Sequence, residues 1–268
     1  MIDELKKKDR FIKLQSNQLL EKLNSKEIIL YKEINIYFSD YVNFYKIPAN
    51  EIIKIHNSFV QNYLEDCKKF FLNKDYKIAR DKNYKLDRKQ YDIILILSCL
   101  LLPHRFNILN ELVNFNFKDK KNKTLFIGIG SGLEIFLLRD KIRNYEAYDI
   151  NISSFVKKKF KDKINQKLYT YKKNLYYYIF AIELLEHLEQ PFKMLDELYK
   201  SLYKNSILFT TTAKNIPQFD HYYNFTNKKK FEEKIKIIGF KILSKKILRH
   251  SGLKNNLNSN NILYKLKK

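Results

Sequence analysis

The stretch TLFIGIGSG, residues 124–132, decides the fold, because it places three of the chain's five glycines at alternate positions directly after a short apolar run. The run at 124–127 predicts a buried strand, and the amphipathic segment that starts at Leu133 predicts a helix after the turn. Because glycine has no Cβ, the backbone at Gly128, Gly130 and Gly132 can approach a ligand closely. A strand-to-helix turn of this kind predicts a site for a nucleotide-like ligand.

The pattern continues outward from this turn toward the carboxyl end of the chain. From residue 123, short apolar runs alternate with amphipathic segments, which is typical of βαβ units and a parallel sheet. Predicted strands lie at 124–127, 145–148, 176–182, 206–212, 240–247 and 260–266, with helices from 133, at 191–202 and at 227–238. The sequence therefore predicts an α/β fold with a doubly wound, mostly parallel sheet over residues 116–268.

Residues 1–115 carry a helical pattern and predict a helical N-terminal cap or lid packed on the edge of the sheet. A helix is expected to begin near Pro48, and the segment 91–113 predicts a helix interrupted near Pro103. The polar segment 74–89 predicts a surface connection, and the Asn-rich segment 254–261 predicts a hairpin loop. The aromatic stretch 37–45 is expected to be core rather than a ligand cage.

The formal net charge of +23 raises the question of a nucleic-acid partner. Only seven of the 52 basic residues are Arg, the residue preferred for bidentate phosphate contacts. The Lys excess accompanies heavy use of Asn, Ile and Tyr, whose codons are also rich in A and T. The charge is thus explained by a codon bias spread over solvated faces, and a nucleic-acid partner is the less favoured expectation.

Location and redox state are predicted from the cysteines and the apolar segments. Cys67 and Cys99 lack CxxC spacing and lie in apolar surroundings, so they predict reduced core thiols in a cytoplasmic protein. The N-terminus begins acidic without the apolar segment of a signal peptide. The longest apolar run, 93–102, is about half of what spans a bilayer, so a buried helix and no membrane span are expected.

Asp149 follows the second predicted strand, 17 residues beyond Gly132. A carboxylate at that point of a Rossmann-like sheet can accept both hydroxyls of a ribose. The glycine spacing is GxGxG, and Leu133 stands where a GxGxxG motif has its third glycine, so a nicotinamide cofactor is disfavoured. The alternative interpretation is a tight turn beside a surface acid. It does not explain why the glycine turn and Asp149 each follow directly on a predicted strand.

A third block, AIELLEHLEQP at 181–191, follows the strand predicted at 176–182. With the glycine turn and Asp149, it resembles the class I S-adenosylmethionine-dependent methyltransferases over residues 124–268. The resemblance implies a seven-stranded Rossmann-like sheet and S-adenosylmethionine as cofactor. It implies that the three glycines and Asp149 contact the cofactor, with Glu183 and Leu184 near the point of methyl transfer.

Two departures from that family concern the middle of the domain. Only 33 residues separate Asp149 from Glu183, fewer than usual, and residues 169–173 offer no acid where an Asp commonly holds the adenine amine. Adenine is therefore expected to be held by backbone groups or by aromatic stacking.

His187 and His221 are the predicted catalytic side chains. A histidine with its ordinary pKa near 6.5 can remove a proton from an attacking hydroxyl at neutral pH. The alternatives are that His187 only caps the strand end and that His221 is a surface-loop residue without a role. Correct orientation of a good nucleophile is a further route to transfer without a base.

A divalent metal is a further alternative at the same place. Glu183, Glu186, His187 and His221 offer mixed oxygen and nitrogen ligands. That set resembles two subgroups, the ubiquinone-pathway O-methyltransferases and the methyltransferases of the 3′-terminal ribose of small RNAs. Because metal-free relatives also carry E-x-x-E-H or similar segments, no metal is predicted and the four residues stay as the alternative set.

Taken together, these features predict S-adenosylmethionine-dependent methyl transfer to an oxygen or nitrogen atom of a small-molecule metabolite. The alternatives are an RNA 2′-O-ribose methyltransferase and a non-catalytic scaffold that keeps the fold. The acceptor, the oligomeric state and the role of the N-terminal helices are not predicted by the sequence.

Overall fold

A computed structural model describes residues 1–73, 87–250 and 259–268. Most of the predicted connection at 74–89 and of the predicted hairpin loop at 254–261 therefore lies outside the described residues. Among the described residues, six helices precede the sheet, and they are α1 (Ile2–Lys8), α2 (Arg10–Leu20), α3 (Ser25–Tyr45), α4 (Ala49–Asn73), α5 (Arg88–Leu101) and α6 (Pro103–Val113).

The remaining elements alternate between strands and helices. The strands are β1 (Thr124–Ile127), β2 (Tyr145–Asp149), β3 (Ile164–Gln166), β4 (Tyr176–Ala181), β5 (Leu202–Lys214), β6 (Lys241–Arg249) and β7 (Asn260–Lys267). The helices are α7 (Leu133–Leu137), α8 (Ser154–Phe160), α9 (Pro191–Ser201) and α10 (Lys228–Ile238), with short 3-10 turns η2 (Lys161–Lys163) and η3 (Leu185–His187).

The strands form one seven-stranded sheet in the order β3-β2-β1-β4-β5-β7-β6. The pairs from β3 to β5 are parallel, whereas β7 runs antiparallel to both β5 and β6. This confirms the predicted doubly wound, mostly parallel, seven-stranded sheet. The strand order reverses between β1 and β4, which is where ligands bind in open α/β sheets.

Two strands differ from the sequence-based expectation. β3 was not identified, because three residues that are only half-buried or exposed form no apolar run. β5 spans 13 residues rather than the predicted seven, since it begins earlier, where Leu202 pairs with Tyr176 of β4, and ends later, where Ala213 and Lys214 pair with β7.

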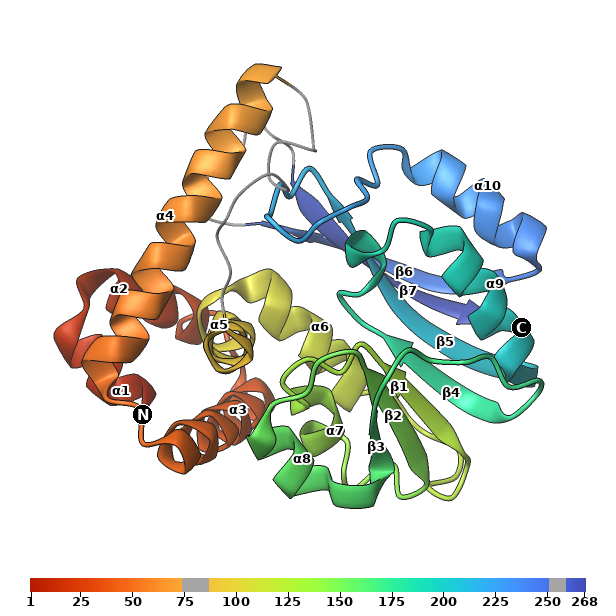
Figure 1. Cartoon of the computed structure of the whole chain (residues 1–268), viewed down its shortest axis with the longest axis horizontal. Helices are drawn as coiled ribbons and strands as arrows, with labels where there is room; N and C mark the ends of the chain where they lie inside the picture. The colour runs from red at the N-terminus through yellow and green to blue at the C-terminus, as the bar shows by residue number, and fades with distance from the viewer. Residues whose placement is uncertain (74–86, 251–258) are drawn as a thin grey trace.

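Helices cover both faces of the sheet (Figure 1). On one face α9 and α10 bury Leu195, Leu198, Phe231 and Ile235 against the strands. On the other face the strands pack against α7, α8 and the N-terminal helices in one continuous apolar cluster. The N-terminal helices therefore share a core with the sheet.

Local sequence signals explain the cap helices. Asn24 and Glu27 form a reciprocal capping box at the start of α3. Pro103, at the first position of α6, ends the apolar run of α5, and the two helix axes bend by 86°. Within the aromatic stretch, Tyr37, Phe38 and Tyr41 are fully buried in α3, as predicted for core residues, whereas Phe44 is exposed.

The apolar helices and the thiols are also placed by the structure. No single described helix has the length and apolar character to cross a membrane, although the bent pair α5 and α6 reaches both when taken together. Cys67 and Cys99 are both buried, as predicted, and burial raises the pKa of each thiol to about 11.

Candidate functional site

The turn after β1 is built so that only glycine fits its three alternate positions. Gly128, Gly130 and Gly132 have φ angles of +67°, +53° and +75°. A Cβ on Gly128 would lie 2.7 Å from Leu184, and one on Gly132 would lie 2.6 Å from the ring of Phe160. The turn is further fixed from the cap, because the Tyr37 hydroxyl donates to the Ser131 carbonyl at 2.6 Å. The glycines thus serve tight packing as well as close approach of the backbone to a ligand.

Asp149 ends β2 beside this turn. One of its carboxylate oxygens accepts a hydrogen bond from the Gly130 N–H at 2.9 Å, and the other accepts from the Asn151 N–H at 2.9 Å. Each carboxylate oxygen has a second lone pair, so the group can still accept from a ligand. The structure therefore joins the predicted ribose acid directly to the glycine turn.

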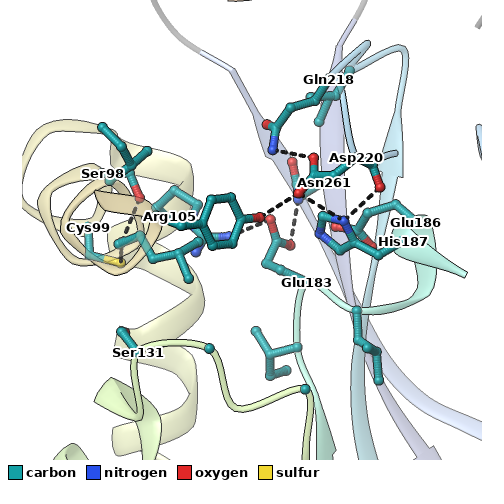
Figure 2. A pocket seen from close by; sticks show the side chains of 18 of the residues that line it. Ser98, Cys99, Arg105, Ser131, Glu183, Glu186, His187, Gln218, Asp220 and Asn261 are labelled. Atoms are coloured by element: carbon teal, nitrogen blue, oxygen red, sulfur yellow. Dashed lines mark hydrogen bonds and ion pairs between the residues drawn. The ribbon is translucent and has the colours of Figure 1, made fainter. Parts of the chain in front are cut away.

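A cavity of about 890 Å³ opens between the N-terminal helices and the carboxyl ends of the strands. Its wall includes the glycine turn, Asp149 and the residues that follow β4. It also includes residues of α2, α4, α5 and α6, so the cap forms one side of it. Figure 2 shows Ser98 and Cys99 of α5 and Arg105 of α6 on that side. This volume lies near the upper end of the range for small-molecule sites, about 300–1,000 Å³.

Glu183, the first residue of the E-x-x-E-H segment, is held by protein groups. Its carboxylate pairs with the Arg105 guanidinium at 2.6 Å and accepts from the Asn261 amide at 2.6 Å, and Figure 2 shows both converging on it. Its N–H donates to the Thr211 hydroxyl at 2.7 Å, and its φ of +49° lies in the left-handed region. Burial raises the pKa of this carboxyl, but the Arg105 charge and the hydrogen bonds outweigh burial and lower it.

His187 lies at the end of η3 and has a carboxylate partner. Its Nδ1 lies 3.0 Å from the Asp220 carbonyl and 3.4 Å from an Asp220 carboxylate oxygen. Asp220 in turn accepts from the Tyr91 hydroxyl at 2.7 Å and from the Gln218 amide at 2.8 Å. Burial lowers the pKa of His187, but its interactions with the Asp220 carboxylate and then with Glu186 outweigh burial and raise it.

Asp220 and Tyr91 were not identified from the sequence. Asp220 is adjacent to the predicted His221, and an acid beside a candidate base was a usable signal. Tyr91 lies 129 residues away on α5, and helical periodicity alone gives no indication of that contact.

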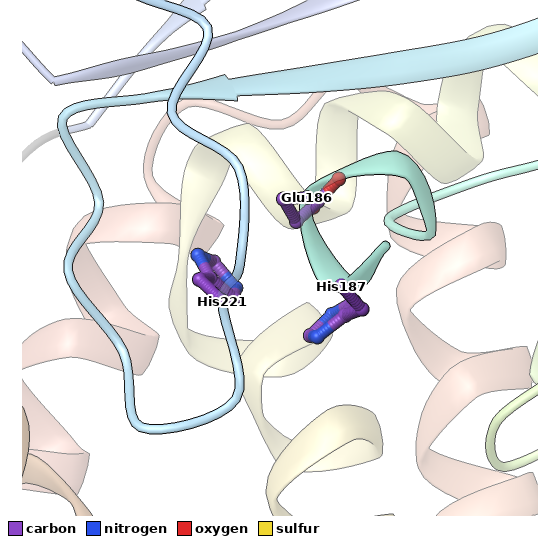
Figure 3. A group of neighbouring side chains, drawn as sticks. All are labelled: Glu186, His187 and His221. Carbon is purple, nitrogen blue, oxygen red and sulfur yellow. The ribbon is translucent and has the colours of Figure 1, made fainter. Parts of the chain in front are cut away.

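His221 faces His187 from the loop after β5 (Figure 3). The two ring centres are 4.7 Å apart, and the rings are nearly perpendicular. The Nδ1 of His221 lies 2.8 Å from the Ile216 carbonyl, so this ring is held in a fixed orientation. Burial, together with the charge on His187, lowers the pKa of His221 to about 4.

Glu186 completes this group and is almost fully buried. Its backbone carbonyl accepts from the N–H groups of Tyr222 and Tyr223, which ties the loop of His221 to η3. Its Oε2 has no hydrogen-bond partner among the described residues. Burial and the nearby Glu183 charge raise the pKa of this carboxyl to about 8.

The structure thus brings together three residues of the four-residue set. One ligand atom from each of Glu186, His187 and His221 lies within 4.8 Å of the other two. Glu183 contributes to the same cavity but is paired with Arg105. A carboxylate and two imidazoles are a donor set that fits a divalent ion, and the orphaned Oε2 of Glu186 agrees with that fit.

Apolar side chains line the cavity near residues 169–173, where the sequence lacks an acid. Ile150 and Leu168 both line the cavity, and both side chains are largely exposed. Tyr169 is buried, and its hydroxyl is hydrogen-bonded to Ser201 at 2.8 Å.

The comparisons with known proteins concern the fold. No protein-family model and no curated protein matches the sequence. Phosphoethanolamine N-methyltransferase 2 of Haemonchus contortus, in complex with S-adenosyl-L-methionine, superposes with a TM-score of 0.52 at 13% identity, covering 72% of this chain and 60% of that one. The N-methyltransferase NodS of Bradyrhizobium japonicum gives 0.49 at 13% identity, with coverages of 62% and 88%. The [4+2]-cyclase SpnF gives 0.47 at 11% identity, with coverages of 61% and 80%. The strand order and the first of these superpositions show that the chain has the Rossmann-like fold of the class I S-adenosylmethionine-dependent methyltransferases.

Proposed function

We propose that the chain is an S-adenosylmethionine-dependent methyltransferase that acts on an oxygen or nitrogen atom of a small molecule. The observation that carries this proposal is that one cavity has the glycine turn and Asp149 on one side and the His187–Asp220 pair on another. The Haemonchus enzyme, which has the same fold, binds S-adenosyl-L-methionine. The resemblance in sequence and the likeness in fold therefore support the same cofactor.

The cofactor is assigned to the part of the cavity next to the turn. The turn Gly128–Gly132 and the Asp149 carboxylate would hold the amino-acid and ribose parts, and Ile150 and Leu168 would pack on adenine. Glu183 and Leu184 would lie beside the sulfur. When bound, the cofactor supplies an electrophilic methyl group on a sulfonium.

His187 is the proposed base. It removes the proton from the acceptor oxygen or nitrogen, and the Asp220 carboxylate stabilises the imidazolium that results. Tyr91 and Gln218 hold that carboxylate in place. His221, which is neutral because of its lowered pKa, packs against the His187 ring and shapes the acceptor side of the cavity.

The lining of the cavity favours a small molecule over RNA. Its outer wall, from α2 and α4, includes Phe11, Leu14, Phe59, Val60 and Leu64. Among the described lining residues only Lys22 and Lys167 are lysines, so the cavity does not present a continuous basic face. An acceptor with an apolar part suits such a wall.

The Oε2 atom of Glu186 has no hydrogen-bond partner among the described residues, and this favours a metal-assisted variant of the proposed function. A divalent ion held by Glu186, His187 and His221 would orient the acceptor oxygen and lower its pKa. His187 would then be a ligand instead of a base.

Methyl transfer from labelled S-adenosylmethionine tests the proposal. The purified chain is given a small-molecule extract or total RNA, and formation of S-adenosylhomocysteine is measured. We expect product with the small-molecule extract and not with RNA, and a loss of product in His187→Gln. Transfer to RNA alone would contradict a small-molecule acceptor. Cofactor binding without transfer to either substrate would favour a non-catalytic scaffold.

A further inference from the structure

Helix α5 of the cap lies directly against the glycine turn. A Cβ on Gly130 would lie 2.9 Å from Leu95 and 3.8 Å from Nη2 of Arg88, both from α5. Arg88 also lines the cavity. A guanidinium from the cap therefore stands beside the backbone of the turn that is assigned to the cofactor.

The surroundings of Arg88 leave hydrogen-bond donors unused. Its Nη2 lies 2.8 Å from the carboxylate of Asp92, which is fully buried and also accepts from the Tyr41 hydroxyl at 3.3 Å. Its Nε is buried and has no hydrogen-bond partner among the described residues. Because a guanidinium has five N–H donors in a rigid fork, the pair with Asp92 orients Arg88 without using all of them.

The other cations of the cavity are less suited to an anion at the turn. Arg105 is paired with Glu183 at 2.6 Å. Lys22 lies just after α2, and Lys167 lies just after β3. Arg88 is thus the cation that combines contact distance to the turn with an unused buried donor.

We propose that Arg88 binds the α-carboxylate of the amino-acid part of the adenosyl cofactor, with Asp92 as its positioning residue. A charge-assisted hydrogen bond from a guanidinium is among the stronger contacts that a carboxylate makes. The proposal rests on the proposed function. It makes the cap a part of the cofactor site, so that cofactor binding ties α5 to the sheet.

Calorimetric titration with two ligands tests this contact. S-adenosylhomocysteine carries the carboxylate, whereas S-adenosyl-3-thiopropylamine keeps the nucleoside, the thioether and the amine but lacks it. We expect Arg88→Gln to raise the Kd of the first ligand by about tenfold to a hundredfold and to leave the Kd of the second unchanged. Arg139→Gln, at an exposed arginine paired with Glu33, is the matched control and changes neither.

The outcomes separate this inference from the proposed function. An equal loss of affinity for both ligands, or no loss for either, would overturn the role of Arg88 while cofactor binding by the wild-type chain stands. If the affinity for neither ligand changes, the anion that binds Arg88 would instead be a carboxylate of the acceptor. Failure of the wild-type chain to bind either ligand would contradict the proposed function itself.

Because Arg88→Gln leaves Asp92 buried without its cation, a second variant keeps the test valid if the first fails to fold. Arg88→Gln/Asp92→Asn removes both charges. The same selective loss for the carboxylate-bearing ligand is expected, and a variant that binds both ligands like the wild type would refute the proposal.

Discussion

The carboxylate of Asp149 accepts a hydrogen bond from the backbone N–H of Gly130 at 2.9 Å, which joins the end of β2 to the turn after β1. The acid and the glycine turn, which follow consecutive predicted strands in the sequence, are therefore in direct contact. This contact holds the Asp149 carboxylate, the proposed acceptor for the ribose hydroxyls, against the glycine turn.

Removing the Asp149 carboxylate is expected to weaken cofactor binding. Asp149→Ala should raise the Kd for S-adenosylhomocysteine about tenfold to a hundredfold, because a charge-assisted contact of about 1.5–3 kcal/mol is lost. Asp149→Asn keeps an acceptor for the Gly130 N–H and should lose less. Asp140→Ala, at an exposed acid, is the control. A twofold change in Asp149→Ala would mean that another group holds the ribose.

Activity in excess chelator separates a base from a metal at the acceptor side. We expect full turnover, because His187 already has Asp220 as the carboxylate partner that a general base requires. Loss of turnover that Mg²⁺ or Mn²⁺ restores would instead support the ion held by Glu186, His187 and His221. In that case His221→Ala and Glu186→Ala should each raise the metal concentration needed.

The Arg105–Glu183 pair is expected to matter for stability. Arg105→Met should lower the free energy of unfolding by about 3–5 kcal/mol, because it leaves a buried carboxylate uncompensated. Arg105→Met/Glu183→Met should recover most of that loss. Urea denaturation followed by circular dichroism measures both. Equal stability of Arg105→Met and the wild type would contradict the pairing at 2.6 Å.

Acid sensitivity is expected from Glu146 in β2. Partial burial raises the pKa of this carboxyl, but hydrogen bonds from Lys123, Lys172 and Tyr176 outweigh burial and lower it to about 2. The unfolded value is near 4.5, so its contribution to stability is present above pH 4.5 and is lost as pH falls from there toward 2.

Denaturation midpoints at several pH values test this expectation. Glu146→Gln should be less stable than the wild type at pH 6, and the difference should shrink as pH falls from 4.5 toward 2. A difference that is constant over that range would show that the carboxylate is not the stabilising group.

The fold could be predicted from the sequence because its signals are local. The apolar runs of β1, β2 and β4, the glycine turn and Asp149 each lie within a short window, and their order along the chain implies the sheet. β3 could not be predicted, since three residues that are half-buried or exposed carry no periodic signal.

The residues of the candidate site that belong to sequence motifs could be predicted. Those that come from distant helices could not. His187 and His221 were identified by type and position, whereas Tyr91, Arg88 and Arg105 reach the cavity from α5 and α6. Those contacts depend on how the cap packs on the sheet, which helical periodicity does not encode.

The structure also changes which glycine variant is informative. Gly130→Val would be the direct way to block close approach of a ligand to the turn. The φ of +53° and the approach of the Leu95 side chain mean that a valine there would strain the turn and crowd Leu95, so a loss of binding would not separate an effect on the ligand from an effect on the fold.

Calorimetric titration of the purified chain with S-adenosylhomocysteine measures directly whether the cavity binds the adenosyl cofactor. We expect saturable binding of one ligand per chain, and we expect Asp149→Ala/Arg88→Gln, which removes both proposed contacts, to abolish it. A folded wild-type chain that releases or absorbs no heat and shows no thermal stabilisation with millimolar ligand would contradict the proposed cofactor binding.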